Sequence, residues 1–170
     1  MAQTLTTRIL TSMAATASNA LDLSTSANQL ALNIPITLTT GTTTGKADII
    51  FQDRRTLSAS ASETLDLAGG SLTGPLGDAL TFVKIKAIIV SALAANTNDV
   101  VIGGIGSNAF VGPFGATTHT IAVPPGSVTT LTNPGVGWTV TAATGDLLKV
   151  LNGGSGTSVT YDIVIVGTSA

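Results

Sequence analysis

The chain has 170 residues, a formal net charge of -2 and charged side chains at only 9% of its positions. This length suits one domain with a hydrophobic core, and so few cations argue against binding to nucleic acid, which needs many Lys and Arg side chains at the phosphates. Cysteine is absent, which excludes disulfides, thiol catalysis and cysteine metal sites.

Residues 1–28 are predicted to form an N-terminal arm. Apolar side chains recur there every four residues, at Leu5, Ile9, Met13 and Ala17. This spacing suits a short amphipathic helix. Helix caps and charge pairs are missing, so an extended arm that is exchanged with a partner subunit is an equal alternative. No continuous apolar run follows Arg8, so neither a secretory signal nor a membrane-spanning segment is predicted.

Residues 29–170 are predicted to form a single β-sandwich domain, which opens with a strand over residues 29–39. Every second side chain of that strand is apolar, at Leu30, Leu32, Ile34, Ile36 and Leu38. Alternation of this kind is typical of a strand with one buried face. Pro35 has no amide hydrogen, so the strand is expected at an edge or paired along one side only.

The strongest strand pattern is TFVKIKAIIV at residues 81–90. We expect its core face to carry Val83, Ile85, Ala87 and Ile89, and the opposite face to carry Lys84 and Lys86 among apolar neighbours. Each fully buried Val or Ile contributes about 1.5–3 kcal/mol, so this segment is expected to anchor the sheet. A face that mixes lysines with apolar residues suggests cover by another subunit.

Further short strands follow at regular intervals, separated by turns rich in Gly and Pro. Residues 138–141 and 147–151 are predicted to pair with each other. Residues 158–167 alternate cleanly, with Val159, Tyr161 and Ile163 on one face. Eight or more such strands predict an all-β fold, an antiparallel β-sandwich or a jelly roll with an extended N-terminal arm.

Six side chains are candidate contacts with a partner. Arg54 and Arg55 follow Asp53 and form the one concentration of charge on a neutral chain, and guanidinium groups suit bidentate binding to carboxylates. Phe110 and Phe114 lie on a glycine-rich loop at residues 103–115. Lys84 and Lys86 complete the set.

Catalytic and metal chemistry is not predicted. His119 is the sole histidine and has no neighbouring carboxylate in sequence, so a strand-surface role is expected. No three carboxylates cluster as calcium would require. The loop GGIG at residues 103–106 lacks the other parts of a phosphate-binding motif. We therefore expect no cofactor, no metal and no enzymatic activity.

Several segments in the second half resemble small β-rich structural proteins encoded beside capsid genes in tailed bacteriophages. The resemblance is carried by ETLDLAGG at 63–70, LGD at 76–78, FVKIKAIIV at 82–90, AFVGPFG at 109–115, VPPG at 123–126, GWTVT at 137–141 and YDIVIVG at 161–167. It covers about two thirds of the chain and includes no diagnostic motif. The resemblance implies a capsid decoration, or cement, protein that sits on the outside of the virion as an oligomer.

The expected function is therefore non-enzymatic: binding to the outer surface of an assembled phage head and stabilising contacts between major capsid subunits. The expected partners are the major capsid protein and further copies of the chain, as a dimer or trimer. The mean hydropathy of +0.49 with so little charge supports burial in an assembly. The alternative is a tail-fibre or tail-tip module that attaches to host glycans.

Overall fold

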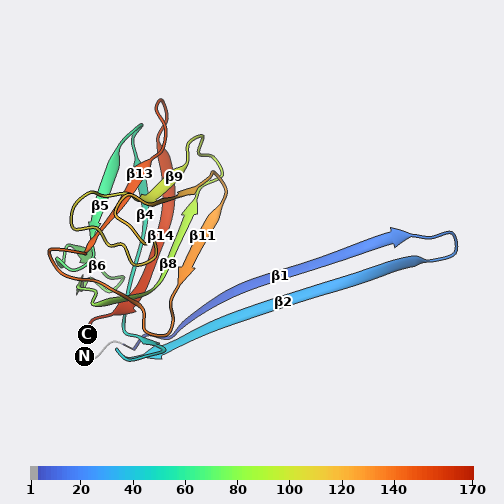
Figure 1. The fold of residues 1–170 in the computed structure, drawn as a ribbon, viewed down its shortest axis with the longest axis horizontal. Helices are drawn as coiled ribbons and strands as arrows, with labels where there is room; N and C mark the ends of the chain where they lie inside the picture. The colour runs from blue at the N-terminus through green and yellow to red at the C-terminus, as the bar shows by residue number, and fades with distance from the viewer. Residues whose placement is uncertain (1–3) are drawn as a thin grey trace.

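The computed structural model describes residues 4–170, and every regular element within that range is a β-strand. Figure 1 shows two parts: a body of short strands, and a long hairpin that leaves one end of the body and projects away from it. The all-β fold predicted from the alternating segments is confirmed.

The body contains two main antiparallel sheets. The strands of the first are β4 (Ile49–Leu57), β8 (Lys84–Ala92), β11 (Val128–Thr132), β12 (Trp138–Thr139) and β14 (Val159–Thr168). Their order is β11-β8-β14-β4, with β12 also paired to β8. The strands of the second are β5 (Ser62–Asp66), β9 (Val100–Gly103), β10 (Thr120–Val123) and β13 (Leu147–Asn152), in the order β10-β9-β13-β5.

Consecutive strands repeatedly pass from one sheet to the other: β4 to β5, β8 to β9, β10 to β11 and β13 to β14. In both sheets an early strand pairs with a late one, β4 with β14 and β5 with β13. Eight strands in two sheets with this order form a jelly roll. The connection between β5 and β8 carries a small extra ladder of β6 (Leu72–Thr73) and β7 (Ala79–Leu80).

One hydrophobic cluster is shared by the two sheets. Tyr161 and Ile163 of β14 contribute from the first sheet, and Ile102 and Val150 from the second; all four side chains are fully buried. Every second residue of β14 from Val159 onward faces this core, as the sequence predicted.

The inward face of β8 differs from the prediction. Ile85 is in the core, but the next core residues are Ile88 and Val90, whereas Ala87 lies in a separate cluster on the other side of the sheet. The pairing of β8 with β14 shifts register between Val166 and Gly167. This β-bulge inserts one extra residue into β8, so the two faces exchange beyond it.

The bulge also brings the strands unusually close. A side-chain carbon at Gly167 would lie 2.2 Å from the Lys84 carbonyl oxygen and 2.7 Å from the Phe82 ring. Only a residue without a side chain fits there.

The pairing predicted between residues 138–141 and 147–151 is wrong. Trp138 of β12 lies opposite Ile85 of β8, in the first sheet, whereas β13 pairs with β5 and β9 in the second. The chain crosses between the sheets where the sequence suggested a tight hairpin. The prediction failed because alternation shows that both segments are strands but does not show which strands they pair with. Their closeness in sequence suggested the wrong partner.

The projecting hairpin consists of β1 (Thr7–Ala20) and β2 (Thr25–Thr40), which are antiparallel over their whole length. The helical alternative for the arm is therefore wrong for residues 7–20. The strand predicted at residues 29–39 is present, but its partner is β1, so the hairpin continues past the predicted boundary at residue 28. Pro35 pairs along one side only, as predicted.

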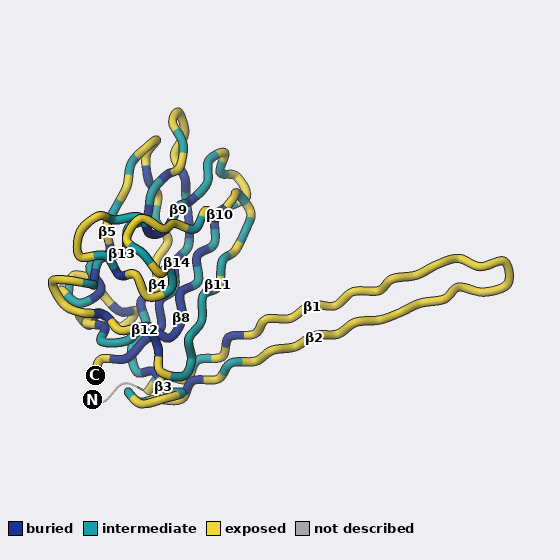
Figure 2. Tube along the Cα trace, viewed as in Figure 1, coloured by how far each residue is buried: buried dark blue, intermediate teal, exposed yellow. Residues whose placement is uncertain are grey.

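The root of the hairpin is fixed to the body by a short parallel contact and by packing. Thr39 and Thr40 of β2 pair with β3 (Lys46–Ala47). The Thr40 hydroxyl donates a hydrogen bond to the Leu5 carbonyl (2.7 Å) and accepts one from the Leu5 amide (2.9 Å). Figure 2 shows the contrast that results: the strands of the body combine buried, intermediate and exposed residues, whereas the hairpin is exposed along nearly all of its length.

Candidate interaction surface

The two faces of the hairpin differ in chemistry. Its register places Met13 opposite Leu32, and Ala15 opposite Leu30, on one face. Ser12 opposite Asn33, and Thr16 opposite Gln29, lie on the other face, because successive residues of a strand point to opposite sides. We define the apolar hairpin face by Met13, Ala15, Ala17, Leu30, Leu32 and Ile34.

The apolar hairpin face has no cover within its own chain. Met13, Leu30, Leu32 and Ile34 each expose between 44% and 51% of their surface. Between residues 9 and 40 the sole charged side chain is Asp22, in the turn at the tip. A contiguous exposed surface of this kind normally marks a site of interaction with another macromolecule.

The tip adds two more exposed leucines. Leu21 and Leu23 are 54% and 101% exposed, in a turn closed by a hydrogen bond from the Leu21 amide to the Ser24 carbonyl (2.7 Å). At about 3.4 Å per residue, the strand from Ile9 to Ala20 is roughly 37 Å long. The leucines therefore sit far from the body, where nothing in their own chain covers them.

Near the body, the same face of the hairpin is packed. Ile9 and Leu38 form a buried root cluster with Ala47, Ala87 and Val166. Ala87 and Val166 are cross-strand neighbours on β8 and β14. The root cluster therefore lies on the side of the first sheet that faces away from the main core.

That side of the sheet continues past the root cluster. Cross-strand pairing places further side chains in rows on it, and we call this surface the outer sheet face: Gln52, Ile89, Ser91, Val128, Thr130 and Val164. Gln52, Val128 and Thr130 are exposed, whereas Ile89, Ser91 and Val164 are half-buried. None of the six carries a charge.

Arg54 and Asp162 form an ion pair at the far edge of this face. Arg54 donates from Nε to Asp162 Oδ1 (2.6 Å) and from Nη2 to Oδ2 (2.8 Å). These hydrogen bonds lower the pKa of the Asp162 carboxyl and raise the pKa of Arg54. Because both hydrogen bonds are made within the chain, the charge of Arg54 is already paired with a carboxylate of its own chain.

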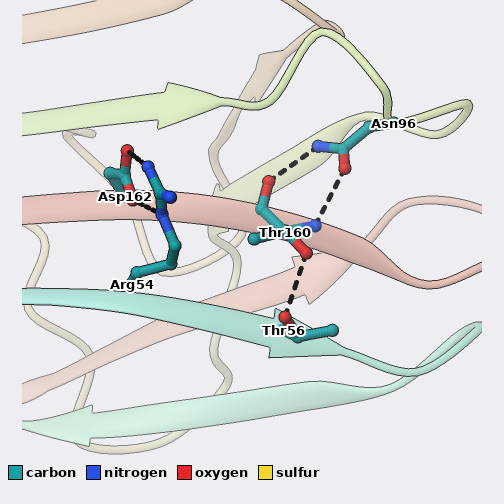
Figure 3. Close-up of polar contacts among 5 residues, drawn as sticks. All are labelled: Arg54, Thr56, Asn96, Thr160 and Asp162. Atoms are coloured by element: carbon teal, nitrogen blue, oxygen red, sulfur yellow. Dashed lines mark hydrogen bonds and ion pairs between the residues drawn. The ribbon is translucent and has the colours of Figure 1, made fainter.

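Figure 3 shows the polar contacts that continue from this pair along β14. Thr160 lies between Asn96 and Thr56: its carbonyl accepts from Asn96 Nδ2 (2.8 Å), its amide donates to Asn96 Oδ1 (2.9 Å), and the two threonine hydroxyls are 2.9 Å apart. These contacts fix the loop after β8 against β14.

Arg55, the second predicted contact, is used inside the body. Its Nη1 donates to Glu63 Oε2, its Nε is 3.0 Å from Asp53 Oδ2, and its guanidinium lies over the Phe51 ring. Glu63 Oε1 accepts a hydrogen bond from the buried Tyr161 hydroxyl (2.5 Å). This network ties β4, β5 and β14 together, and so connects the two sheets.

The remaining predicted contacts are also mostly internal. Phe110 is 2% exposed and belongs to the main core, and Phe114 is half-buried against it. Lys86 is 1% exposed, and its Nζ donates to the Gly135 carbonyl (2.5 Å). Burial, with a smaller effect of nearby Lys84, lowers the pKa of Lys86. Lys84 is half-buried.

The structure therefore brings together a different set from the six predicted side chains. The alternation of residues 30–38 already indicated half of the apolar hairpin face. The sequence did not show that residues 7–20 form the strand that pairs with it. The four-residue spacing of Ile9, Met13 and Ala17 is an even number, so it fits one face of a strand as well as one face of a helix. The turn at residues 21–24 lacks the Asn-Gly or Gly pair that normally signals a hairpin.

The titratable side chains of the described residues are dispersed. Within residues 4–170 no three His, Asp or Glu side chains gather where they could hold a metal ion. His119 is exposed, and its Nδ1 lies 2.8 Å from the Phe114 carbonyl oxygen. No helix in the described part of the chain is long and apolar enough to cross a membrane.

No protein family model, no curated protein and no solved structure matches this chain.

Proposed function

We propose that this chain is a structural protein of a virus particle: a decoration protein that binds the outside of an assembled bacteriophage head and stabilises the contacts between major capsid subunits. The observation that carries the proposal is the apolar hairpin face, which projects from the body and is uncovered along about 20 Å. An isolated two-stranded ribbon is at best marginally stable in water, so the hairpin is suited to a contact outside its own chain.

Shape and charge favour a role in assembly. A body fixed at one point with an arm of roughly 37 Å can span the boundary between two neighbouring subunits of a shell. Binding only to the assembled shell then stabilises that shell by mass action. The nearly uncharged arm and outer sheet face suit permanent, largely apolar contacts between the subunits of an assembly. Jelly rolls occur in viral capsid proteins and also in lectins, so the fold supports this proposal by analogy alone.

The test uses assembled heads of the phage that encodes this chain, purified without it. We expect the added protein to sediment with the heads and to raise the temperature at which they break open. A variant in which residues 12–33 are replaced by a short Asn-Gly turn keeps the root and the body and is the matched control; it is expected to lose the protection. Failure of the full chain to bind heads would contradict the proposal, and labelled protein found at the tail would favour the attachment alternative.

A further inference from the structure

The apolar hairpin face needs a partner, and the structure indicates which surface fits it. We propose that the apolar hairpin face of one copy packs on the outer sheet face of a second copy, so that each chain donates one hairpin and accepts one. This inference rests on the proposed assembly role of the hairpin and names the partner of its apolar face. The tip and the opposite hairpin face, which carries Ser12, Thr16 and Gln29 beside Leu10 and Ala14, remain free to contact a shell.

The first argument is continuity with a contact that already exists. At the root, Ile9 and Leu38 of the hairpin pack on Ala87 and Val166 of the outer side of the first sheet. The same hairpin face continues outward with Met13 and its neighbours, and the same sheet side continues with the row that contains Ile89. The hairpin extension is about half exposed, and the sheet extension combines half-buried residues with exposed ones.

A single chain does not join these two extensions. The hairpin leaves the body at its root and points away from it, so its outer part and the upper part of the sheet diverge (Figure 1). In a second copy the outer sheet face carries the same half-buried and exposed residues. When the hairpin extension of one copy packs on the sheet extension of another, apolar side chains of the hairpin meet the outer side of the sheet, as they do in the root cluster.

The second argument is charge. The apolar hairpin face contains no ionisable side chain, and the charges beside the outer sheet face form one pair, Arg54 and Asp162, in the cross-strand row of Ser91. The nearest charges on the sheet, Arg54 and Asp162, neutralise each other through two hydrogen bonds. A strongly charged partner, such as a nucleic acid or an acidic peptide, would find no counter-charge on either surface. Two copies of the chain, in contrast, bring together two neutral surfaces without burying an unpaired charge.

The third argument is area. Beyond the root, from Thr11 to Ala20, the ribbon is about 31 Å long and about 10 Å wide, so one face covers roughly 300 Å², and one docked hairpin buries roughly 600 Å² in total. That area is typical of a weak contact, whereas stable interfaces bury about 1,200–2,000 Å². Reciprocal exchange doubles the area buried between two copies to roughly 1,200 Å², the lower end of that range. Each copy is therefore expected to donate and accept, as in a closed dimer or trimer.

Because the chain has no cysteine, disulfide cross-linking gives a clean test. Leu30→Cys on the apolar hairpin face is combined with Ile89→Cys on the outer sheet face. Mild oxidation is expected to yield covalent dimers or larger species on a non-reducing gel. The control combines Ile89→Cys with Gln29→Cys, which is the adjacent residue on the opposite hairpin face, and is expected to yield little product. Equal cross-linking of both pairs, or efficient cross-linking of Leu30→Cys alone, would overturn the proposed packing.

A second measurement avoids cross-linking. Leu32→Glu places a charge in the middle of the apolar hairpin face, and Asn33→Glu places the same charge on the opposite hairpin face. Sedimentation of the protein in the absence of heads is expected to show about tenfold or more weaker self-association for Leu32→Glu and no change for Asn33→Glu. A chain that stays monomeric at all concentrations would overturn the inference. Head binding, measured separately, reports on the proposed function, so the two can fail independently.

Discussion

Met13 lies directly opposite Leu32 in the β1–β2 hairpin, and both side chains remain about half exposed, at 51% and 44% of their surface. Nearer the body on the same hairpin face, Ile9 and Leu38 are almost fully buried. The hairpin therefore passes from a packed root to an uncovered ribbon without a change in its chemistry. Beyond the root, no other part of the described chain packs on this face of the ribbon.

In the unassembled chain, the hairpin amides beyond the root are expected to exchange with solvent much faster than those of β8 and β14. A two-stranded ribbon without a third layer opens readily, because its backbone hydrogen bonds are flanked by water on both faces. Hydrogen exchange followed by mass spectrometry measures this. Exchange as slow in residues 12–33 as in the body would show that the ribbon is stable by itself.

Leu38→Ala is expected to lower the free energy of unfolding by about 2–4 kcal/mol, because Leu38 is buried at the root and its loss leaves a cavity. Leu32→Ala, on the exposed part of the same face, is the matched control, with an expected cost below about 1 kcal/mol in the unassembled chain. Urea denaturation of both variants makes the comparison. Similar costs would mean that the root cluster does not anchor the hairpin.

Gly167→Ala is expected to destabilise the protein by about 2–4 kcal/mol, since the new methyl group would overlap the Lys84 carbonyl at the bulge. Gly135→Ala is the control: a side-chain carbon there meets nothing within 4 Å. Thermal melting of the two variants separates a steric effect from the general effect of replacing glycine. If both melt like the unmodified chain, β8 and β14 are not as close at the bulge as described.

Lys86 tests whether the buried ammonium is needed for stability. Lys86→Met retains the length and the packing of the side chain and removes the charge, so its expected cost is below about 1 kcal/mol, or even a gain. Lys86→Ala removes the stem as well and leaves a cavity, with an expected cost of about 2 kcal/mol or more. Both variants remove the hydrogen bond to the Gly135 carbonyl, which keeps the Gly45 amide as a donor (3.4 Å). Chemical denaturation at neutral pH gives both values. A loss for Lys86→Met as large as that for Lys86→Ala would show that the ammonium itself is stabilising.

Tyr161 predicts a loss of stability at alkaline pH. Burial, reinforced by the hydrogen bond to Glu63, raises the pKa of Tyr161 above its usual value of 10.0. Below pH 10 both states keep the proton and the stability is full. Above pH 10 the unfolded chain releases the proton while the folded chain retains it, so the free energy of unfolding falls by about 1.4 kcal/mol per pH unit from this group.

Tyr161 is the only tyrosine, so phenolate absorbance reports on it alone. It is expected to appear together with unfolding and not before. Tyr161→Phe should cost about 1–2 kcal/mol at neutral pH through the lost hydrogen bond, and its stability should depend less on pH above 10. Phenolate absorbance at pH 10 in a fully folded sample would contradict the prediction.

The sequence alone was sufficient for the fold class and for most strands. Alternation in residues 158–167 placed Val159, Tyr161 and Ile163 on one face, and that face is the one buried in the core. Composition alone also excluded disulfides, because the chain has no cysteine. The arm was also expected, although its conformation was left open.

Tertiary structure decided what each strand meets and which side chains stay free. The bulge in β8 lies against Gly167 of β14, far away in sequence, where any side chain would clash with β8. Because of the bulge, Ala87 and Ile88 lie on the opposite faces from those predicted. Arg55, Phe110 and Lys86 resembled surface contacts in the sequence, but they are satisfied by partners in distant segments. The apolar hairpin face became visible only when β1 was paired with β2. The sequence of a strand determines which of its side chains share a face. Whether that face is buried depends on the segments that long-range pairing brings against it.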